Sequence, residues 1–282
     1  MSVLTVACGK SNSDSPTAPS GPPAAGSAIV YSAVGASDAT GHGASVECIP
    51  FGECPNGTGY VPVTVRQLGA QGYPVNLRNL GIPTAVIGPD FEMLGQQYDR
   101  TIVGNFIEQE MPFVLPNSTV VTIFAGGNEV NTITAALGGG AGGADQAGFI
   151  DAQVRAFGAD YATLMGGIRS RAPSARIVVL NLPNLGALPY LAHAAAQQRQ
   201  AAQRAAVGMT TTVINPLTAQ NATVVDLMCD SRAYQIGNYS SDGFHPNDAG
   251  YAFLTDKILP FVNGASSTPT ASCGLMTMVP NL

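Results

Sequence analysis

Short apolar runs rich in β-branched residues alternate along the chain with stretches of helical periodicity. Such runs occupy residues 27–34, 73–82, 118–124, 175–183 and 222–229. Continuously apolar strands are typical of parallel sheets whose two faces are both covered by helices. The sequence therefore predicts an α/β fold with a mainly parallel central sheet. In such sheets, functional groups gather on the loops that follow the carboxyl ends of the strands.

Helical patterns fill the intervals between several of these runs. The clearest begins after Asp145, a predicted N-cap, and ends before Pro173. Others are expected near Pro62, over 188–206 and over 246–262. Residues 83–116 predict loops and short helices. We expect some of the large apolar residues in this region to line a substrate cleft: Phe91, Met93, Leu94, Tyr98, Phe106, Met111 and Phe113.

Composition limits the classes of partner. Of 282 residues, 45% are hydrophobic and only 11% are charged, with a formal net charge of −6. No cluster of Lys and Arg stands out, which argues against nucleic acid as a partner. No run of about 18 apolar residues predicts a transmembrane helix. We expect one domain over 28–282, and a monomer.

The N-terminal segment has a different character. Its start, MSVLTVACGK, resembles the end of a bacterial lipoprotein signal in which Cys8 is lipidated. Only seven residues precede Cys8, so either the signal has been trimmed or the likeness is accidental. The Ser, Pro, Gly and Ala that follow predict a flexible tether, so residues 1–27 are interpreted as a signal remnant and tether. With a lipid on Cys8, the tether would hold the domain off a membrane surface.

Four further cysteines make an even number. The simplest pairing is Cys48 with Cys54 and Cys229 with Cys273, which would close a Gly- and Pro-rich loop and pin the C-terminal segment. Four reduced, buried thiols are the alternative. Disulfides would indicate an oxidising compartment.

Only three histidines are available as a general base: His42, His193 and His245. A catalytic base is usually oriented by a carboxylate on its second ring nitrogen. Only His245 has one placed by local geometry, because Asp242 precedes it by three residues in a turn. The alternative is that the segment DGFHPND is merely a turn and a helix N-cap.

Three other strand ends carry parts of an acyl-transfer site. Ser37 follows the first run, and small neighbours leave room for a sharp bend, although a simple turn serine is the alternative. Gly81 and Asn128 follow two later runs, where a backbone N–H and a side-chain amide are suitable donors to an oxyanion.

Together these residues resemble the SGNH, or GDSL, hydrolase family. Ser37 stands in GASDATG, Gly81 in NLGI, Asn128 in GGNEVN, and Asp242 and His245 in DGFHPN, in the order of the family's four blocks. The family's opening is usually Gly-Asp-Ser, whereas Ala36 precedes Ser37 here. The resemblance implies a three-layer α/β/α sandwich, with Ser37, Asp242 and His245 as the catalytic residues. It also implies an oxyanion hole formed by Ser37, Gly81 and Asn128.

The resemblance further implies a serine carboxylic-ester hydrolase that works through an acyl-enzyme, without metal or organic cofactor. Short-chain or aromatic acyl esters are the expected substrates. Deacetylation of a polysaccharide is an alternative, so the partner is a small-molecule or glycan ester. A non-catalytic surface lipoprotein that binds sugars or a partner on a hydrolase scaffold is a second alternative. The expected location is extracytoplasmic, either secreted or tethered to a membrane.

Overall fold

A five-stranded parallel sheet forms the centre of the protein. The computed structural model describes residues 21–280, so the expectations for residues 1–20, including Cys8, lie outside the described residues. The strand order is β2-β1-β3-β4-β5, and every neighbouring pair is parallel. The strands are β1 (Ile29–Gly35), β2 (Val75–Asn79), β3 (Val120–Phe124), β4 (Arg176–Leu180) and β5 (Ala222–Val225).

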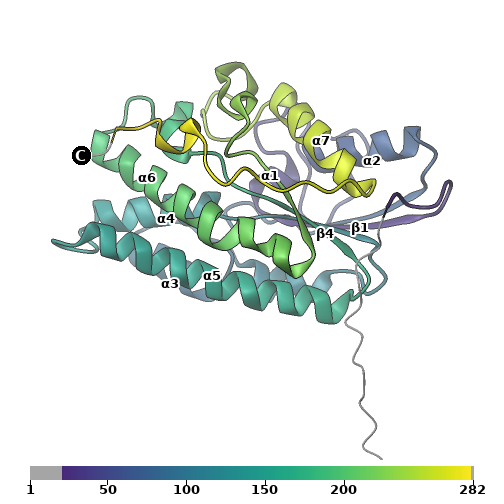
Figure 1. Cartoon of the computed structure of the whole chain (residues 1–282), viewed down its shortest axis with the longest axis horizontal. Helices are drawn as coiled ribbons and strands as arrows, with labels where there is room; N and C mark the ends of the chain where they lie inside the picture. The colour runs from purple at the N-terminus through teal and green to yellow at the C-terminus, as the bar shows by residue number, and fades with distance from the viewer. Residues whose placement is uncertain (1–20, 281–282) are drawn as a thin grey trace, which may run out of the picture.

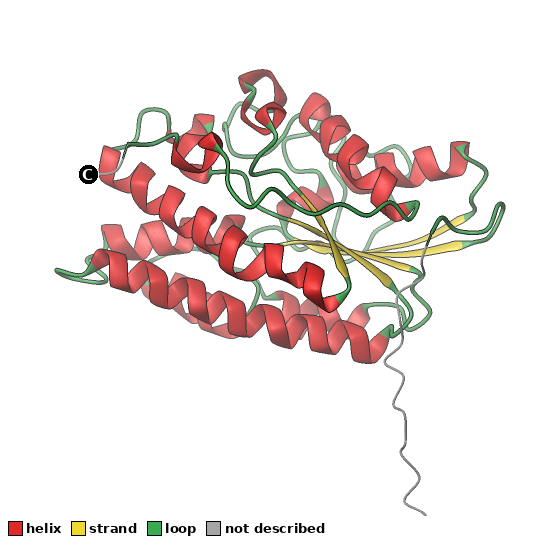
Figure 2. Cartoon of the chain, viewed as in Figure 1, coloured by secondary structure: helices red, strands yellow, loops and turns green. Residues whose placement is uncertain are grey.

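Helices cover both faces of this sheet, as Figures 1 and 2 show. On one face lie α3 (Pro89–Gln97), α4 (Gly127–Gly138), α5 (Gln146–Arg171) and α6 (Ala196–Met209). On the other lie α2 (Tyr60–Ala70) and α7 (Asp248–Val262). Each layer encloses its own hydrophobic core against the sheet. The predicted α/β/α sandwich is therefore confirmed.

Local sequence accounts for the best-defined elements. Strands β3 and β4 are apolar on both faces and nearly wholly buried, because helices lie on each side. Helix α5 is capped by Asp145, whose Oδ1 accepts the N–H of Gly148, and it ends two residues before Pro173. Its apolar positions recur every three or four residues and are buried: Ile150, Val154, Phe157, Tyr161, Leu164, Met165 and Ile168.

Two segments differ from the sequence expectation. The residues after β3 were expected to form only a tight turn, but they continue directly into α4. Gly126 supplies the turn with a φ of 118°, and the helix begins at the next residue. The helix expected over 188–206 begins at Ala196 instead, because Pro189 belongs to a preceding short turn of 3₁₀ helix.

Short helical turns make up most of the remaining regular structure. They include α1 (Ser37–Thr40), directly after β1, and a π-helical turn, η1 (Phe106–Glu110). The rest are η2 (Met111–Phe113), η3 (Leu185–Ala187), η4 (Pro189–Leu191), η5 (Thr210–Ile214), η6 (Asn215–Gln220), η7 (Ser231–Tyr234), η8 (Ile236–Asn238) and η9 (Gly274–Thr277). No helix within residues 21–280 has both the length and the apolar character needed to cross a bilayer.

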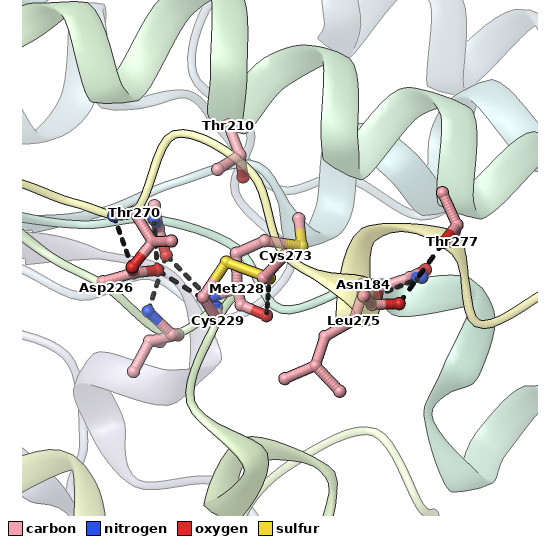
Figure 3. The surroundings of a disulfide bond; sticks show 12 residues. Asn184, Thr210, Asp226, Met228, Cys229, Thr270, Cys273, Leu275 and Thr277 are labelled. Carbon is pink, nitrogen blue, oxygen red and sulfur yellow. Dashed lines mark hydrogen bonds between the residues drawn. A yellow bond between two sulfur atoms is a disulfide. The ribbon is translucent and has the colours of Figure 1, made fainter.

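Two disulfides are present, with the predicted pairing: Cys48 with Cys54 and Cys229 with Cys273. The second fastens the C-terminal segment to the loop that follows β5 (Figure 3). Asp226 reinforces this junction by accepting the backbone N–H groups of Cys229 and Thr270. Disulfides persist in oxidising compartments, which is consistent with an extracytoplasmic location.

Residues 21–27 were expected to belong to the tether, but their backbone is already held by the domain. The carbonyl of Gly21 accepts a hydrogen bond from Arg176, and that of Pro23 accepts one from the Tyr73 hydroxyl. Contacts with the domain therefore begin before residue 28.

Candidate active site

The strand order brings the predicted site residues to one edge of the sheet. Neighbouring strands β1 and β3 lead to crossovers on opposite faces, and ligands of open α/β sheets bind where the order reverses in this way. Ser37 opens α1 immediately after β1, and Asn128 lies in the first turn of α4 after β3. Both line the same cavity.

Ser37, His245 and Asp242 form one hydrogen-bonded chain. Ser37 Oγ lies 2.7 Å from His245 Nε2, although 208 positions separate the two residues in sequence. His245 Nδ1 lies 2.5 Å from Asp242 Oδ2. Because an ionised carboxylate only accepts hydrogen bonds, the proton is on Nδ1 and Nε2 is free to accept the serine proton.

Asp242 is held as a carboxylate by its surroundings. Burial by itself would raise its pKa, but the His245 side chain and the backbone N–H groups of His245 and Phe244 donate to it. The Ser240 hydroxyl donates as well, and the net result is a pKa well below the ordinary value. Oδ1 takes the backbone and Ser240 bonds, which leaves Oδ2 to orient the imidazole.

Asn128 lines the same cavity as Ser37, and its amide is held in place by the chain. Its Nδ2 donates one hydrogen to the carbonyl of Ala85, at 2.9 Å. An amide nitrogen carries two hydrogens, so the second is available for a ligand. The side chain of Asn128 therefore has a fixed orientation and one N–H that can donate a hydrogen bond to a ligand.

Gly81 lies against the nucleophile segment, but its N–H has a different partner. It donates to Asn79 Oδ1 at 3.2 Å, and Gly81 does not line the cavity that contains Ser37. Asn79, which the sequence reasoning missed, also donates from Nδ2 to the carbonyl of Ala39 in α1. An oxyanion role for Gly81 remains a prediction.

Two buried glutamates support the loops at the strand ends. Glu129 stands where the family's third block usually has Asp, but the sequence predicted a structural role for neither glutamate. Glu110 accepts the N–H of Gly35, at the end of β1, and burial raises the pKa of Glu110 well above its ordinary value. Glu129, next to Asn128, accepts the N–H of Ile87. Burial raises the pKa of Glu129 to about 7. The sequence does not indicate this role, because it shows that a residue is glutamate but not that the glutamate is buried.

The cavity beside Ser37 has mainly apolar walls. They come from the ends of β3 and β4 and from the loops around His245, and include Phe124, Leu182, Leu185, Leu188, Tyr239 and Phe244. Of the apolar residues in 83–116 expected at the cleft, Phe106 lines this cavity. Phe91 instead packs in the core, and Met93 and Phe113 are exposed.

Solved structures share this fold at low sequence identity. A lipase from a goat rumen metagenome is 19% identical, with a TM-score of 0.58, and the match covers 84% of this chain and 98% of that one. An extracellular lipase from Streptomyces rimosus is 20% identical, with a TM-score of 0.55, over 85% of this chain and 100% of that one. An acetylxylan esterase from Geobacillus stearothermophilus is 16% identical, with a TM-score of 0.53, over 87% and 98%.

No curated protein matches the chain in sequence. The family model of the GDSL-like lipase/acylhydrolases, in contrast, matches residues 33–253. That interval is most of the chain, and it contains every residue of the site described above. The chain therefore belongs to the GDSL-like lipase/acylhydrolase family and is a carboxylic ester hydrolase.

Proposed function

We propose that the protein hydrolyses carboxylic esters with a short-chain or aromatic acyl group, through an acyl-enzyme on Ser37. The observation that carries this proposal is the unbroken chain from Ser37 Oγ through His245 to Asp242, beside an apolar cavity. A nucleophile, a base and an orienting carboxylate in hydrogen-bonding contact are the parts that acyl transfer requires.

In the first half-reaction, Ser37 Oγ attacks the ester carbonyl and His245 Nε2 takes the hydroxyl proton. Asp242 stabilises the imidazolium, and the amide of Asn128 donates to the developing oxyanion. His245 then gives its proton to the departing alcohol. In the second half-reaction a water transfers a proton to His245 as it attacks the acyl carbon. The bond from the acyl carbon to Ser37 Oγ then breaks, His245 returns the proton to Oγ, and the acid is released.

The walls of the cavity favour an apolar acyl group. Each methylene that is removed from water contributes about 0.8 kcal/mol, which is about fourfold in kcat/KM when the transition state retains the contact. Acetylated sugars would place hydroxyl groups near the site, whereas most of the exposed surface of the cavity walls is apolar. We therefore favour short-chain or aromatic acyl esters over polysaccharide deacetylation.

The test is hydrolysis of p-nitrophenyl acetate, butyrate, octanoate and benzoate, together with acetate release from acetylated xylan. We expect kcat/KM to rise from acetate to butyrate or benzoate, and Ser37→Ala to lose all turnover. Ser174→Ala is the matched control, because Ser174 is exposed in the loop between α5 and β4. It should keep full activity.

Labelling with a fluorophosphonate separates the remaining possibilities. Wild type should be labelled, and Ser37→Ala should not. Retained turnover by a folded Ser37→Ala protein would show that the nucleophile is another residue. Absence of both labelling and hydrolysis in wild type would favour a non-catalytic scaffold. A clear preference for acetylated xylan would favour the deacetylase alternative.

A further inference from the structure

A second histidine lies against the proposed catalytic base. The rings of His42 and His245 meet edge to face, with centroids 4.5 Å apart and an interplanar angle of 82°. A ring nitrogen of each histidine and a carboxylate oxygen of Asp242 all lie within 4.8 Å of one another. Among residues 21–280, these three side chains are close enough together to hold a metal ion.

The backbone of His42 is fixed on both sides. Its N–H donates to the carbonyl of Ser37, and its own carbonyl accepts the hydroxyl of Tyr251. Gly41 and Gly43, with φ of 75° and 87°, turn the chain sharply around it. The backbone of His42 is therefore held just after α1, while its side chain is about half exposed.

The ring of His42 is also oriented by a carboxylate. His42 Nδ1 lies 3.2 Å from Glu47 Oε2, and the other oxygen of Glu47 accepts the N–H of Gly43 at 2.9 Å. A histidine that donates one ring N–H to a carboxylate presents its other nitrogen as a lone pair, which is the usual arrangement around a metal-bound imidazole. Glu47 immediately precedes Cys48, so the first disulfide fastens this loop.

We propose that His42, His245 and Asp242 form an inhibitory binding site for a divalent transition-metal ion such as Zn²⁺. Two imidazoles and a carboxylate are a ligand set that Zn²⁺ accepts, whereas Mg²⁺ and Ca²⁺ prefer oxygen ligands. Tetrahedral bonds of about 2.0–2.2 Å place ligand atoms about 3.4 Å apart, so a pair near the 4.8 Å limit must close in by on the order of 1 Å. His245 Nδ1, which lies 2.5 Å from Asp242 Oδ2, must move apart from it if that nitrogen is the ligand. His42 and Glu47 are both about half exposed, so their side chains can shift together and bring the free nitrogen of His42 closer.

A bound ion disables the base whichever nitrogen of His245 it takes. Coordination through Nε2 uses the lone pair that accepts the Ser37 proton. Coordination through Nδ1 releases the ring proton to solvent and separates His245 from Asp242. Inhibition of hydrolysis rests on the proposed function of these residues, but binding of the ion does not.

Binding is measured first, without reference to activity, by titrating the full chain with Co²⁺ and recording its visible absorption. Wild type and Ser37→Ala should bind about one ion each, and His42→Gln should lose the band. His193→Gln is the matched control, since His193 is the remaining histidine, is exposed and does not belong to the cluster. It should behave as wild type.

Inhibition is then measured with Zn²⁺ on a p-nitrophenyl ester, each variant being normalised to its own rate without metal. We expect His42→Gln to raise the half-inhibitory Zn²⁺ concentration at least about tenfold, and Glu47→Gln, which removes only the orienting carboxylate, by about tenfold. Mg²⁺ and Ca²⁺ should not inhibit. Glu47→Gln also provides the test if His42→Gln does not fold.

An unchanged Co²⁺ band in both His42→Gln and Glu47→Gln would overturn the site. Equal Zn²⁺ inhibition of wild type and His42→Gln would overturn the inhibitory role of His42. If wild type does not hydrolyse any ester, the Co²⁺ titration still decides whether the ion binds here.

Discussion

At the scale of single residues, Asn79 and Gly81 determine how closely the end of β2 approaches α1. A Cβ on Gly81 would lie 2.6 Å from the Cβ of Ala39 and 3.0 Å from the carbonyl of Ala36. Only glycine fits at that separation. Asn79 fixes it further, because its side chain bonds both Gly81 and Ala39. A packing requirement thus accounts for Gly81 whether or not its N–H reaches the substrate.

The proposed donation from the amide of Asn128 to the oxyanion gives a prediction at this scale. We expect Asn128→Ala to lower kcat by about 10²–10³-fold with little change in KM, because the amide serves the transition state more than the bound ester. Steady-state kinetics on p-nitrophenyl butyrate provide the measurement. Thermal unfolding controls for loss of structure. A folded variant within twofold of wild type would remove Asn128 from the oxyanion hole.

At the scale of elements, Asp160 on α5 lies against the beginning of α3. A Cβ on Gly88, the N-cap of α3, would lie 2.4 Å from Asp160 Oδ2. That oxygen is buried and has no hydrogen-bond partner among residues 21–280. Burial, followed by the negative charge of Asp90, raises the pKa of Asp160 to about 6. The contact between the two helices therefore favours the protonated carboxyl.

This contact predicts a pH-dependent stability. The pKa of Asp160 in the folded protein lies above the unfolded value of about 3.9. Its contribution to the free energy of unfolding is therefore fully present below about pH 4 and is lost as the pH rises through about 6. Asn cannot ionise. We therefore expect Asp160→Asn to gain stability relative to wild type between pH 4 and pH 8, as measured by urea unfolding.

Asp151, on the same helix, provides a control of opposite sign. Its hydrogen bond with Arg204 lowers the pKa of Asp151, so its contribution is present above about pH 4 and lost on acidification. Asp151→Asn should lose stability relative to wild type as the pH rises to about 5 from below 4, and the difference should stay constant above that pH. The same direction of change in both variants would contradict the assigned pKa shifts.

At the scale of the whole molecule, the two disulfides close loops of very different length. Cys48 and Cys54 are 6 positions apart, whereas Cys229 and Cys273 are 44 positions apart. Loop-closure entropy in the unfolded chain predicts a stabilisation of about 2 kcal/mol for the shorter loop and about 4 kcal/mol for the longer. Denaturant unfolding of the paired Cys→Ser variants measures each contribution. Equal losses would show that native contacts, rather than chain entropy, set the difference.

Much of the fold could be predicted from sequence because its signals are local. Five apolar runs gave the strands, and a periodic run between Asp145 and Pro173 gave α5. Helix α4 was missed because paired glycines are typical of a turn. In the structure Gly126 does make the turn, but the chain then packs Val130 and Ile133 into the core, and this burial stabilises a helix that its sequence only weakly indicates.

The sequence by itself determined which residue types follow each strand. It placed Ser37 and Asn128 at strand ends and the Asp242–His245 turn before the last helix. Only the tertiary structure decided which of them meet. In the folded protein Ser37 hydrogen-bonds His245, which is 208 positions away in sequence. The N–H of Gly81 donates to Asn79, and the ring of His42 packs edge to face on that of His245. The physical reason is that secondary structure follows local periodicity, whereas these contacts depend on packing between segments that are distant in the chain.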